Sequence, residues 1–303
     1  MILINEKTKV LVQGITGKEG SKVALQMQNY GTKVLAGVTP GKGGEEVHGV
    51  PVYDTVAQAL KNHPGINASF VAVPNFAALS AVKEAAVAKI GLINVLTEHV
   101  PVHDTAVMIA LAKQNNVCLV GPSSIGIIAP GTGKIGSIGG DDPRGVFSPG
   151  VVGVISKSGG MASEISWILT TAGLGQSTVV GIGGDILIGS NFADLLLQFD
   201  GDDQTRVVVL FGEIGGTYEE EAAEYISGKG KAGRGKFSKP VVAFVSGLFA
   251  ETLPSGTKLG HAGAIVYGNK GSYPSKVEAL KRAGVVMAKT LDEIPTLVKK
   301  ELK

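Results

Sequence analysis

The sequence predicts an α/β protein with two parallel sheets, each covered by helices. Two observations carry this prediction: short runs of β-branched residues alternate with helical stretches, and the 44 glycines cluster where these runs end. Strands that alternate with helices form parallel sheets, and their ligands bind beyond the carboxyl ends of the strands. With 303 residues, 44% of them hydrophobic, the chain is long enough for two cores.

The alternation falls into two series. The expected strands of the first series are residues 9–12, 34–38, 69–73, 93–96 and 117–120. Those of the second series are residues 151–156, 178–182, 207–211, 241–245 and 285–288. The stretch between the two series is rich in Gly, Pro and Ser, as domain boundaries often are. We therefore expect a Rossmann-like domain over residues 1–125, a linker over 126–149 and a flavodoxin-like domain over 150–303.

Composition and charge exclude several classes of protein. A formal net charge of +2, without long runs of like charge, argues against a nucleic-acid surface and against a basic membrane-binding patch. No apolar run approaches the ~18 residues of a membrane span, and polar residues follow Met1 closely, so we expect a cytoplasmic protein. The sequence shows no cluster with metal-ligand spacing, so no metal site is expected.

The first expected strand runs into a glycine-rich turn over residues 13–20, and a helix follows. Such a turn places free backbone N–H groups and the positive end of a helix dipole where an anion can bind. The glycines do not follow the spacing G-x-G-x-x-G. The turn alone therefore leaves open whether it is an anion site or an ordinary turn.

The loop after the second expected strand has a lysine in the region where NAD-binding folds carry an acidic residue. Residues 38–44 read V-T-P-G-K-G-G. Lys42 indicates either a ligand with a phosphorylated ribose, which is NADP or the 3′-phosphate of coenzyme A, or a solvated loop lysine. The ends of the next two strands supply residues 73–75 and 96–98, at the edge where a ligand would lie.

In the second half, the strand that ends at Ser156 runs into a second glycine-softened turn at the start of a helix. This turn suits a phosphoryl group, although Ser158 also fits a simple N-cap. Glu213 lies among glycines at the end of a later strand. It is either an exposed turn carboxylate or a partner that orients an imidazole. The acidic residues that follow, 219–221 and 224, are interpreted as a solvated helix face.

A single histidine, His261, lies in the segment G-H-A-G-A over residues 260–264, between residues too small to cover it. It is either an ordinary surface-loop histidine or a nucleophile or general base with room for a bulky group to arrive and leave. Either chemical role requires an orienting carboxylate and a second site for the incoming group.

Over nearly the whole chain, four motifs in register resemble the α subunit of succinyl-CoA synthetase and its relatives. They are V-T-P-G-K-G-G at 38–44, G-I-G-G-D at 181–185, G-E-I-G-G at 212–216 and G-H-A-G-A at 260–264. The resemblance implies that a β subunit of the ATP-grasp class uses Mg-nucleotide, ATP or GTP, to phosphorylate His261. The phosphoryl group then passes to a substrate carboxylate, and the thiol of coenzyme A (CoA) attacks the acyl phosphate. The partner subunit would form an αβ pair or a dimer of αβ pairs.

The resemblance also implies roles for residues at matching positions. Glu213 orients His261. The residues implied to hold the phosphoryl group are Ser158, Gly159, Gly160 and Met161. The residues implied to line the CoA site of the N-terminal domain are Thr16, Gly17, Lys18, Glu19, Lys42, Pro74, Leu96, Thr97 and Glu98.

Two departures from the family pattern concern the small carboxylic acid that the enzyme uses. Succinyl-CoA synthetases usually read G-P-N-C-P-G where residues 121–126 read G-P-S-S-I-G, and S-R-S-G-T-L-T-Y-E where residues 156–164 read S-K-S-G-G-M-A-S-E. Ser163 in place of a tyrosine opens volume, and Ser123 and Ser124 add hydroxyls, so these three serines are expected at the substrate. The segments 158–161 and 134–140 are closer to the synthetase portion of ATP-citrate lyase.

These features favour the small subunit of a citryl-CoA synthetase. The alternative is the α subunit of a succinyl-CoA synthetase, with succinate as the substrate. A different class, an NADP-binding oxidoreductase, is permitted by Lys42 and the first glycine turn but leaves the His261 motif without a role.

Overall fold

The chain folds into two compact units in its computed structural model. The N-terminal unit comprises residues 3–143 and 181–190, and the C-terminal unit comprises residues 1–2, 144–180 and 191–303. The structure describes residues 1–229, 236–252, 260–266 and 271–303. Over this described part, none of the helices combines the length and the apolar character needed to cross a bilayer.

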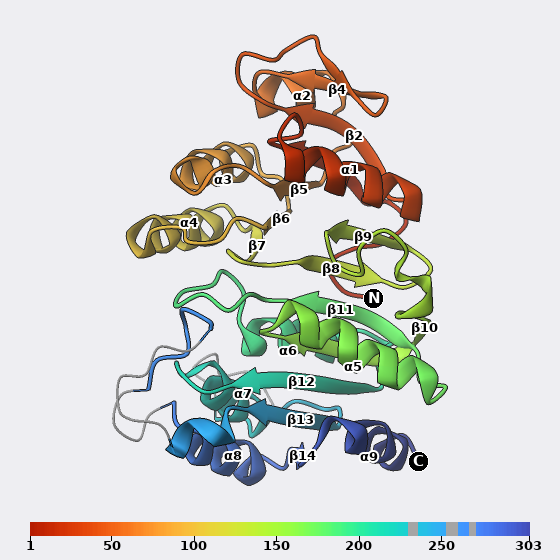
Figure 1. Cartoon of the computed structure of the whole chain (residues 1–303), viewed down its shortest axis with the longest axis vertical. Coiled ribbons are helices and arrows are strands. Elements are labelled where there is room, and N and C mark those ends of the chain that lie inside the picture. The colour runs from red at the N-terminus through yellow and green to blue at the C-terminus, as the bar shows by residue number, and fades with distance from the viewer. Residues whose placement is uncertain (230–235, 253–259, 267–270) are drawn as a thin grey trace. The chain divides into compact units, whose positions relative to one another are not determined.

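The N-terminal unit is built on a sheet with the strand order β3-β4-β2-β1-β5-β6-β7 (Figure 1). The strands are β1 (Lys9–Gln13), β2 (Lys33–Val38), β3 (Glu46–Val47), β4 (Val50–Tyr53), β5 (Ala68–Val71), β6 (Leu92–Val95) and β7 (Cys118–Val120). Apart from the antiparallel pair β3–β4, the strands are parallel. The order reverses at β1, which lies between β2 and β5, and ligands of open α/β sheets bind at such a point.

The helices of this unit bury apolar faces against the sheet. They are α1 (Lys18–Tyr30), α2 (Val56–Asn62), the short 3₁₀ helix η1 (Asn75–Ala77), α3 (Ala78–Val87) and α4 (Val102–Gln114). The helices α3 and α4 pack on each other, and their buried alanines and Met108 join Leu11, Ile93 and Val95 of the strands in one core cluster. The small alanine side chains let the helices approach the sheet closely.

The segment 126–149, expected as a linker, contains two strands, β8 (Gly126–Ala129) and β9 (Gly133–Gly136), which pair antiparallel. Strand β9 packs against α1. The Thr32 hydroxyl donates to the Lys134 carbonyl at 2.7 Å and accepts from the Lys134 N–H at 2.9 Å. Contacts therefore group residues up to 143 with the N-terminal unit, and the limits drawn from composition stay a prediction.

The C-terminal unit contains the strand order β14-β13-β12-β10-β11. The strands are β10 (Pro149–Ser156), β11 (Gln176–Gly181), β12 (Val207–Glu213), β13 (Val241–Ser246) and β14 (Val286–Met287). Counted along the chain, this is the order 2-1-3-4-5 of flavodoxin-like sheets. Strands β10, β12, β13 and β14 run parallel, so their carboxyl ends share one edge.

Helices cover this sheet in two groups. The helices and short 3₁₀ helices are η2 (Pro143–Gly145), α5 (Gly159–Thr171), α6 (Phe192–Asp200), α7 (Tyr218–Ile226), η3 (Leu248–Thr252), α8 (Tyr273–Arg282), η4 (Leu291–Glu293) and α9 (Ile294–Glu301). Helix α7 packs against both α6 and α8, while α5 packs against α9. The core between them includes Phe192 and Phe199 of α6 and Val208 and Leu210 of β12, all fully or almost fully buried.

The predicted fold class, a Rossmann-like domain followed by a flavodoxin-like domain, is confirmed. Each strand expected from a β-branched run has a counterpart within a few residues. The sequence prediction missed β3, β4, β8 and β9, because these short strands lack a long β-branched run or carry glycine at both ends.

Candidate active site

His261 and Glu213 are in direct contact in the C-terminal unit. The Glu213 Oε2 atom lies 2.6 Å from the imidazole Nδ1 atom. The Glu213 side chain is 13% exposed, whereas that of His261 is 37% exposed. A short bond to a largely buried carboxylate fixes the ring orientation and stabilises positive charge on it. The contact that the sequence predicted between His261 and Glu213 is therefore present in the structure. The chemical role of the pair stays a prediction.

The loop that carries His261 lies against the turn that follows Glu213. Gly215 has φ +90, and a Cβ atom there would lie 2.3 Å from the Gly263 carbonyl oxygen and 2.4 Å from the Ile265 nitrogen. The Ala264 N–H donates to the His261 carbonyl at 3.1 Å, which closes a tight turn at the histidine. Glycine at position 215 is thus required both by the backbone conformation and by this close approach.

The phosphate-binding turn predicted at residues 158–161 opens helix α5. Ser158 is the N-cap, and its hydroxyl accepts from the Met161 N–H at 3.5 Å. The Ser156 hydroxyl donates to the Ser158 carbonyl at 2.6 Å and holds the turn from inside. Gly160 is exposed and has open space at its Cβ position, so the start of the helix is accessible to an anion.

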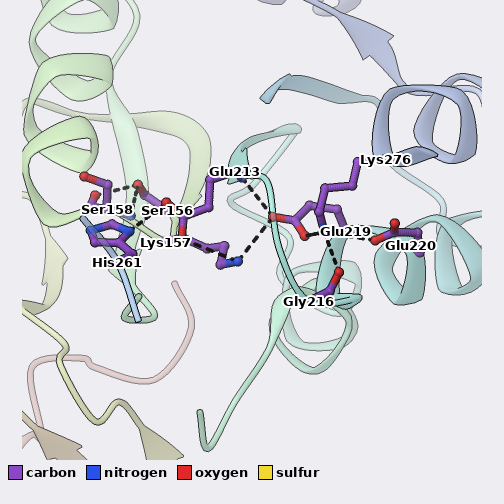
Figure 2. A network of polar contacts seen from close by, with 9 residues as sticks. All are labelled: Ser156, Lys157, Ser158, Glu213, Gly216, Glu219, Glu220, His261 and Lys276. Carbon is purple, nitrogen blue, oxygen red and sulfur yellow. Dashed lines mark hydrogen bonds and ion pairs between the residues drawn. The ribbon is translucent and has the colours of Figure 1, made fainter. Parts of the chain in front are cut away.

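Sheet register brings the turn and Glu213 to one edge. Ser156, the last residue of β10, pairs with Phe211 of the adjacent strand β12, and β12 ends at Glu213. The carboxyl ends of these neighbouring parallel strands thus place the open start of α5 and the contact between His261 and Glu213 on the same side of the unit (Figure 2). This arrangement suits an imidazole that receives a charged group.

The interpretation of the acidic stretch on α7 as a solvated helix face is wrong for Glu219, whereas Glu224 is exposed as expected. Glu219 is 2% exposed and forms ion pairs with Lys276 and Lys157. Both lysines are buried as well. A helix periodicity argument misses such residues because their partners, at positions 157 and 276, are distant in sequence.

The residues predicted for CoA follow four adjacent strands of the N-terminal unit. Gln13 pairs in register with Val38 and Val71, and Val71 pairs with Val95. The corresponding loops therefore leave the same sheet edge, and they carry residues 16–19, Lys42, Pro74 and residues 96–98.

The glycine turn after β1 is shaped for close backbone approach. Gly14 has φ +83, and a Cβ atom there would lie 2.4 Å from the Ala72 carbonyl oxygen. Gly17 caps α1 without a side-chain hydrogen bond, and Gly17, Lys18 and Glu19 are exposed. The Thr16 hydroxyl donates to the Thr39 hydroxyl at 3.1 Å, which ties the turn to the loop of Lys42. The start of α1 therefore offers backbone N–H groups to an anion.

The remaining residues of this edge differ in exposure. Lys42 is exposed, with its Nζ atom 2.9 Å from Glu45 Oε1. Pro74 and Glu98 are exposed, whereas Leu96 and Thr97 are half-buried. The Thr97 hydroxyl donates to the Val73 carbonyl at 2.7 Å and so links the loops after β5 and β6.

The three serines predicted at the substrate lie in different surroundings. Ser163 is half-buried on α5, one turn beyond Ser158. Ser123 is half-buried with φ 58, and its N–H donates to the Thr97 carbonyl at 2.9 Å. Ser124 is fully buried. Its hydroxyl donates to the Gly181 carbonyl and accepts from Asn94 Nδ2 at 2.7 Å, so it holds the loop together and is not presented to a substrate.

Within the part of the chain that the structure describes, no group of three or more His, Cys, Asp or Glu side chains is placed to hold a metal ion. The residues that sequence reasoning missed at the site are Gly215, Lys157, Glu219 and Lys276. Of these, only Gly215 was indicated by the sequence, through the pair of glycines at 215–216.

Comparison with known proteins addresses the family directly. Residues 5–99 match the family model of the CoA binding domain, and residues 155–286 match that of CoA-ligase. The chain is 48% identical to succinate–CoA ligase [ADP-forming] subunit alpha 2 of Archaeoglobus fulgidus, over 98% of each chain. The chain belongs to the family of CoA-ligase α subunits. Another relative is the ADP-forming succinate–CoA ligase α subunit of Aquifex aeolicus, 45% identical over 100% of this chain and 95% of that protein.

A solved structure supports the family membership. ATP citrate lyase from Methanothrix soehngenii, in complex with citrate and coenzyme A, superposes with a TM-score of 0.90 at 26% identity. The match covers 99% of this CoA-ligase α subunit and 50% of the lyase chain. The match of residues 5–99 to the CoA binding domain also favours CoA over NADP as the ligand of the N-terminal unit.

Proposed function

We propose that this chain is the α subunit of an ADP-forming succinate–CoA ligase, in which His261 relays a phosphoryl group from nucleotide to succinate. The observation that carries the proposal is the 2.6 Å contact between His261 Nδ1 and Glu213 Oε2, beside the open start of α5. Relatives at 44–48% identity act on succinate by name. They support succinate over our first expectation, citrate.

The first step is phosphorylation of the histidine. Because Nδ1 is bonded to Glu213, Nε2 is the nitrogen that attacks the γ-phosphorus of the nucleotide. A P–N bond forms as the bond from phosphorus to the β-phosphate oxygen breaks, and ADP leaves. The Nδ1 proton stays between the ring and Glu213, whose negative charge stabilises the positive phospho-imidazole. The turn 158–161 binds the phosphoryl oxygens through its backbone N–H groups.

The second and third steps use the acid and CoA. A succinate carboxylate oxygen attacks the phosphorus, the P–N bond breaks and an acyl phosphate forms. The CoA sulfur then attacks the acyl carbon, phosphate leaves, and the thiol proton passes to phosphate or solvent. The mixed anhydride preserves the energy of the nucleotide until the thioester forms. Ser123 and Ser163 are the proposed contacts to the acid.

CoA is proposed to bind along the four-strand edge of the N-terminal unit. The start of α1 receives a phosphate, and Lys42 contacts the 3′-phosphate of the ribose. In a thermal-shift titration, CoA should stabilise the chain, and Lys42→Ala should weaken this effect for CoA but not for 3′-dephospho-CoA. An equal loss of stabilisation with both ligands would contradict the proposed contact between Lys42 and the 3′-phosphate.

Citrate remains the second candidate because of two sequence features. Ser163 stands where the family pattern has a tyrosine, and residues 158–161 read S-G-G-M. The structural neighbour that binds citrate is consistent with this chemistry at 26% identity. Removing a ring opens volume for a larger acid without requiring one. The kcat/KM for succinate, citrate and malate separates the candidates, and a higher value for citrate would overturn succinate.

The nucleotide site is proposed to lie on a partner β subunit of the ATP-grasp class, which binds ATP or GTP with Mg. The complex is an αβ pair or a dimer of such pairs. The decisive test combines the chain with its partner, Mg and nucleotide labelled at the γ-phosphorus. We expect an acid-labile label on the wild-type chain and none on His261→Asn. Label that persists in His261→Asn would contradict the proposal.

A further inference from the structure

A chain of buried charges lies behind the catalytic pair (Figure 2). Lys157 Nζ is 3.5 Å from Glu213 Oε1 and 3.7 Å from Glu219 Oε1. The second oxygen of Glu219 pairs with Lys276, whose Nζ atom also lies 3.0 Å from Glu220 Oε2. The charges therefore continue from the histidine partner to helix α8.

Lys157 belongs to the turn that follows β10, where a lysine would ordinarily be interpreted as a phosphate ligand. Its position argues against that role. The side chain is 1% exposed and its ammonium group points to two carboxylates, with the Tyr218 ring centroid 5.8 Å away. An ammonium group this deep must be compensated by negative charge, and Glu213 and Glu219 supply it.

The two oxygens of the Glu213 carboxylate face different neighbours. Oε2 contacts the imidazole, while Oε1 is buried without a hydrogen bond, and its nearest charge is Lys157. An unpaired buried oxygen would be costly without this positive charge. Lys157 therefore acts on Glu213 from the side away from His261.

Glu219 fixes the geometry of this arrangement. Its Oε1 accepts the Glu213 backbone N–H at 3.0 Å. Its other oxygen is held by Lys276, which also donates to the Gly216 carbonyl at 3.0 Å. Glu219 thus anchors both the Glu213 backbone and the Lys157 ammonium group to α7 and α8.

We infer that Lys157 is a positioning residue for phosphoryl transfer: its buried ammonium group, held by Glu219, places positive charge beside Glu213 and keeps that carboxylate oriented toward Nδ1 of His261. This inference rests on the proposed function of His261. The alternative is that the buried charges stabilise the fold alone. The two accounts differ in the pH dependence of His261 phosphorylation, because only the first couples the charge of Lys157 to the His261–Glu213 pair.

The test measures the single-turnover rate of His261 phosphorylation against pH, with wild-type partner subunit and labelled Mg-ATP. Lys157→Met removes the positive charge at similar length. We expect a rate at neutral pH about tenfold lower, as for one lost charged interaction. We also expect the acid limb of the profile to move up by about half a pH unit or more, since loss of a nearby positive charge favours the protonated form of the His261–Glu213 pair. Lys157→Arg, which restores the residue of the family pattern, should keep most of the rate.

Glu219→Gln provides a test of opposite sign. It removes a negative charge near Glu213, so the acid limb should move to lower pH. Glu220→Gln is the matched control, because it makes the same change at the next residue of α7. The Glu220 carboxylate contacts Lys276 and Ser275, on the far side from Glu213. The acid limb of the Glu220→Gln profile should stay within about 0.2 pH units of that of the wild type.

The results separate the two claims. Shifts of opposite sign in Lys157→Met and Glu219→Gln support the positioning role. An unmoved acid limb in both, with rates that fall only in proportion to lost thermal stability, would overturn it. If Lys157→Met does not fold, the direction of the Glu219→Gln shift decides alone. If the wild-type chain is labelled but the variants show no change in rate or acid limb, only this inference is refuted. If the wild-type chain is not labelled, the proposed function is refuted as well.

Discussion

Replacing Glu213 by Gln tests the histidine–carboxylate pair with minimal change in shape. The amide oxygen can still accept from Nδ1, but the negative charge is lost. A hydrogen bond to a charged group contributes about 1.5–3 kcal/mol, and 1.4 kcal/mol corresponds to a tenfold change in rate. His261 is 37% exposed, so solvent screens part of this interaction and the lower half of the range applies. We expect phosphorylation to slow by about 10- to 50-fold.

Rapid-quench measurement of the first turnover is the appropriate assay, because it isolates phosphorylation from later steps. Glu213→Asp is the companion variant: it keeps the charge but shortens the side chain, so its rate should fall between those of wild type and Glu213→Gln. A Glu213→Gln rate within twofold of wild type would refute the claim that the charge of Glu213 stabilises the phospho-imidazole.

Three further predictions follow from the structure. Gly215→Ala should displace the His261 loop and abolish labelling, because the new Cβ meets backbone at 2.3 Å. Gly216→Ala carries the strain of φ +61 but has open space at its Cβ, so it should keep most of the labelling, and equal loss in both variants would contradict the steric explanation. Burial lowers the pKa of Lys134 to about 8, so the folded state binds fewer protons than the unfolded state between about pH 8 and 10.5. Unfolding free energy should therefore rise by about 1–2 kcal/mol from pH 7 to 9.5, and chemical denaturation of Lys134→Met should lack this rise. Burial raises the pKa of Asp202, but hydrogen bonds from the Met1 amino group and Thr205 outweigh it and lower the pKa. Asp202→Asn should therefore lower the melting temperature at pH 7, with a difference that vanishes as pH falls below about 4; a difference that persists there would remove the ion pair as its cause.

The sequence predicted the fold well because its signals were local. β-Branched runs such as residues 207–211 identified the long central strands, and glycines marked where they end. The strands at 126–129 and 133–136 escaped prediction because a segment rich in Gly and Pro reads as a linker. Their place is set by Thr32, about a hundred residues away in sequence, whose hydroxyl bonds to the backbone of Lys134.

The contact between His261 and Glu213 was also predictable, since small residues around His261 and glycines around Glu213 are local patterns. The buried charges were not. Glu219 sits in a run of three glutamates that suggests a solvated helix, and Lys157 sits in a turn that suggests a phosphate ligand. Their burial depends on Lys276 and on the register of β10 with β12, which no spacing rule reveals. Ser124 shows the same limit, because its hydroxyl is used by Asn94 and Gly181 within the protein.

The phosphoryl relay through His261 is tested most directly by a chase. The chain is phosphorylated by its partner subunit from nucleotide labelled at the γ-phosphorus, and the nucleotide is then removed. Unlabelled succinate and CoA are added under the same buffer conditions. We predict that the label leaves His261 as inorganic phosphate while succinyl-CoA forms in equal amount. A label that stays on His261, or succinyl-CoA formed equally well from nucleotide by His261→Asn, would contradict the relay.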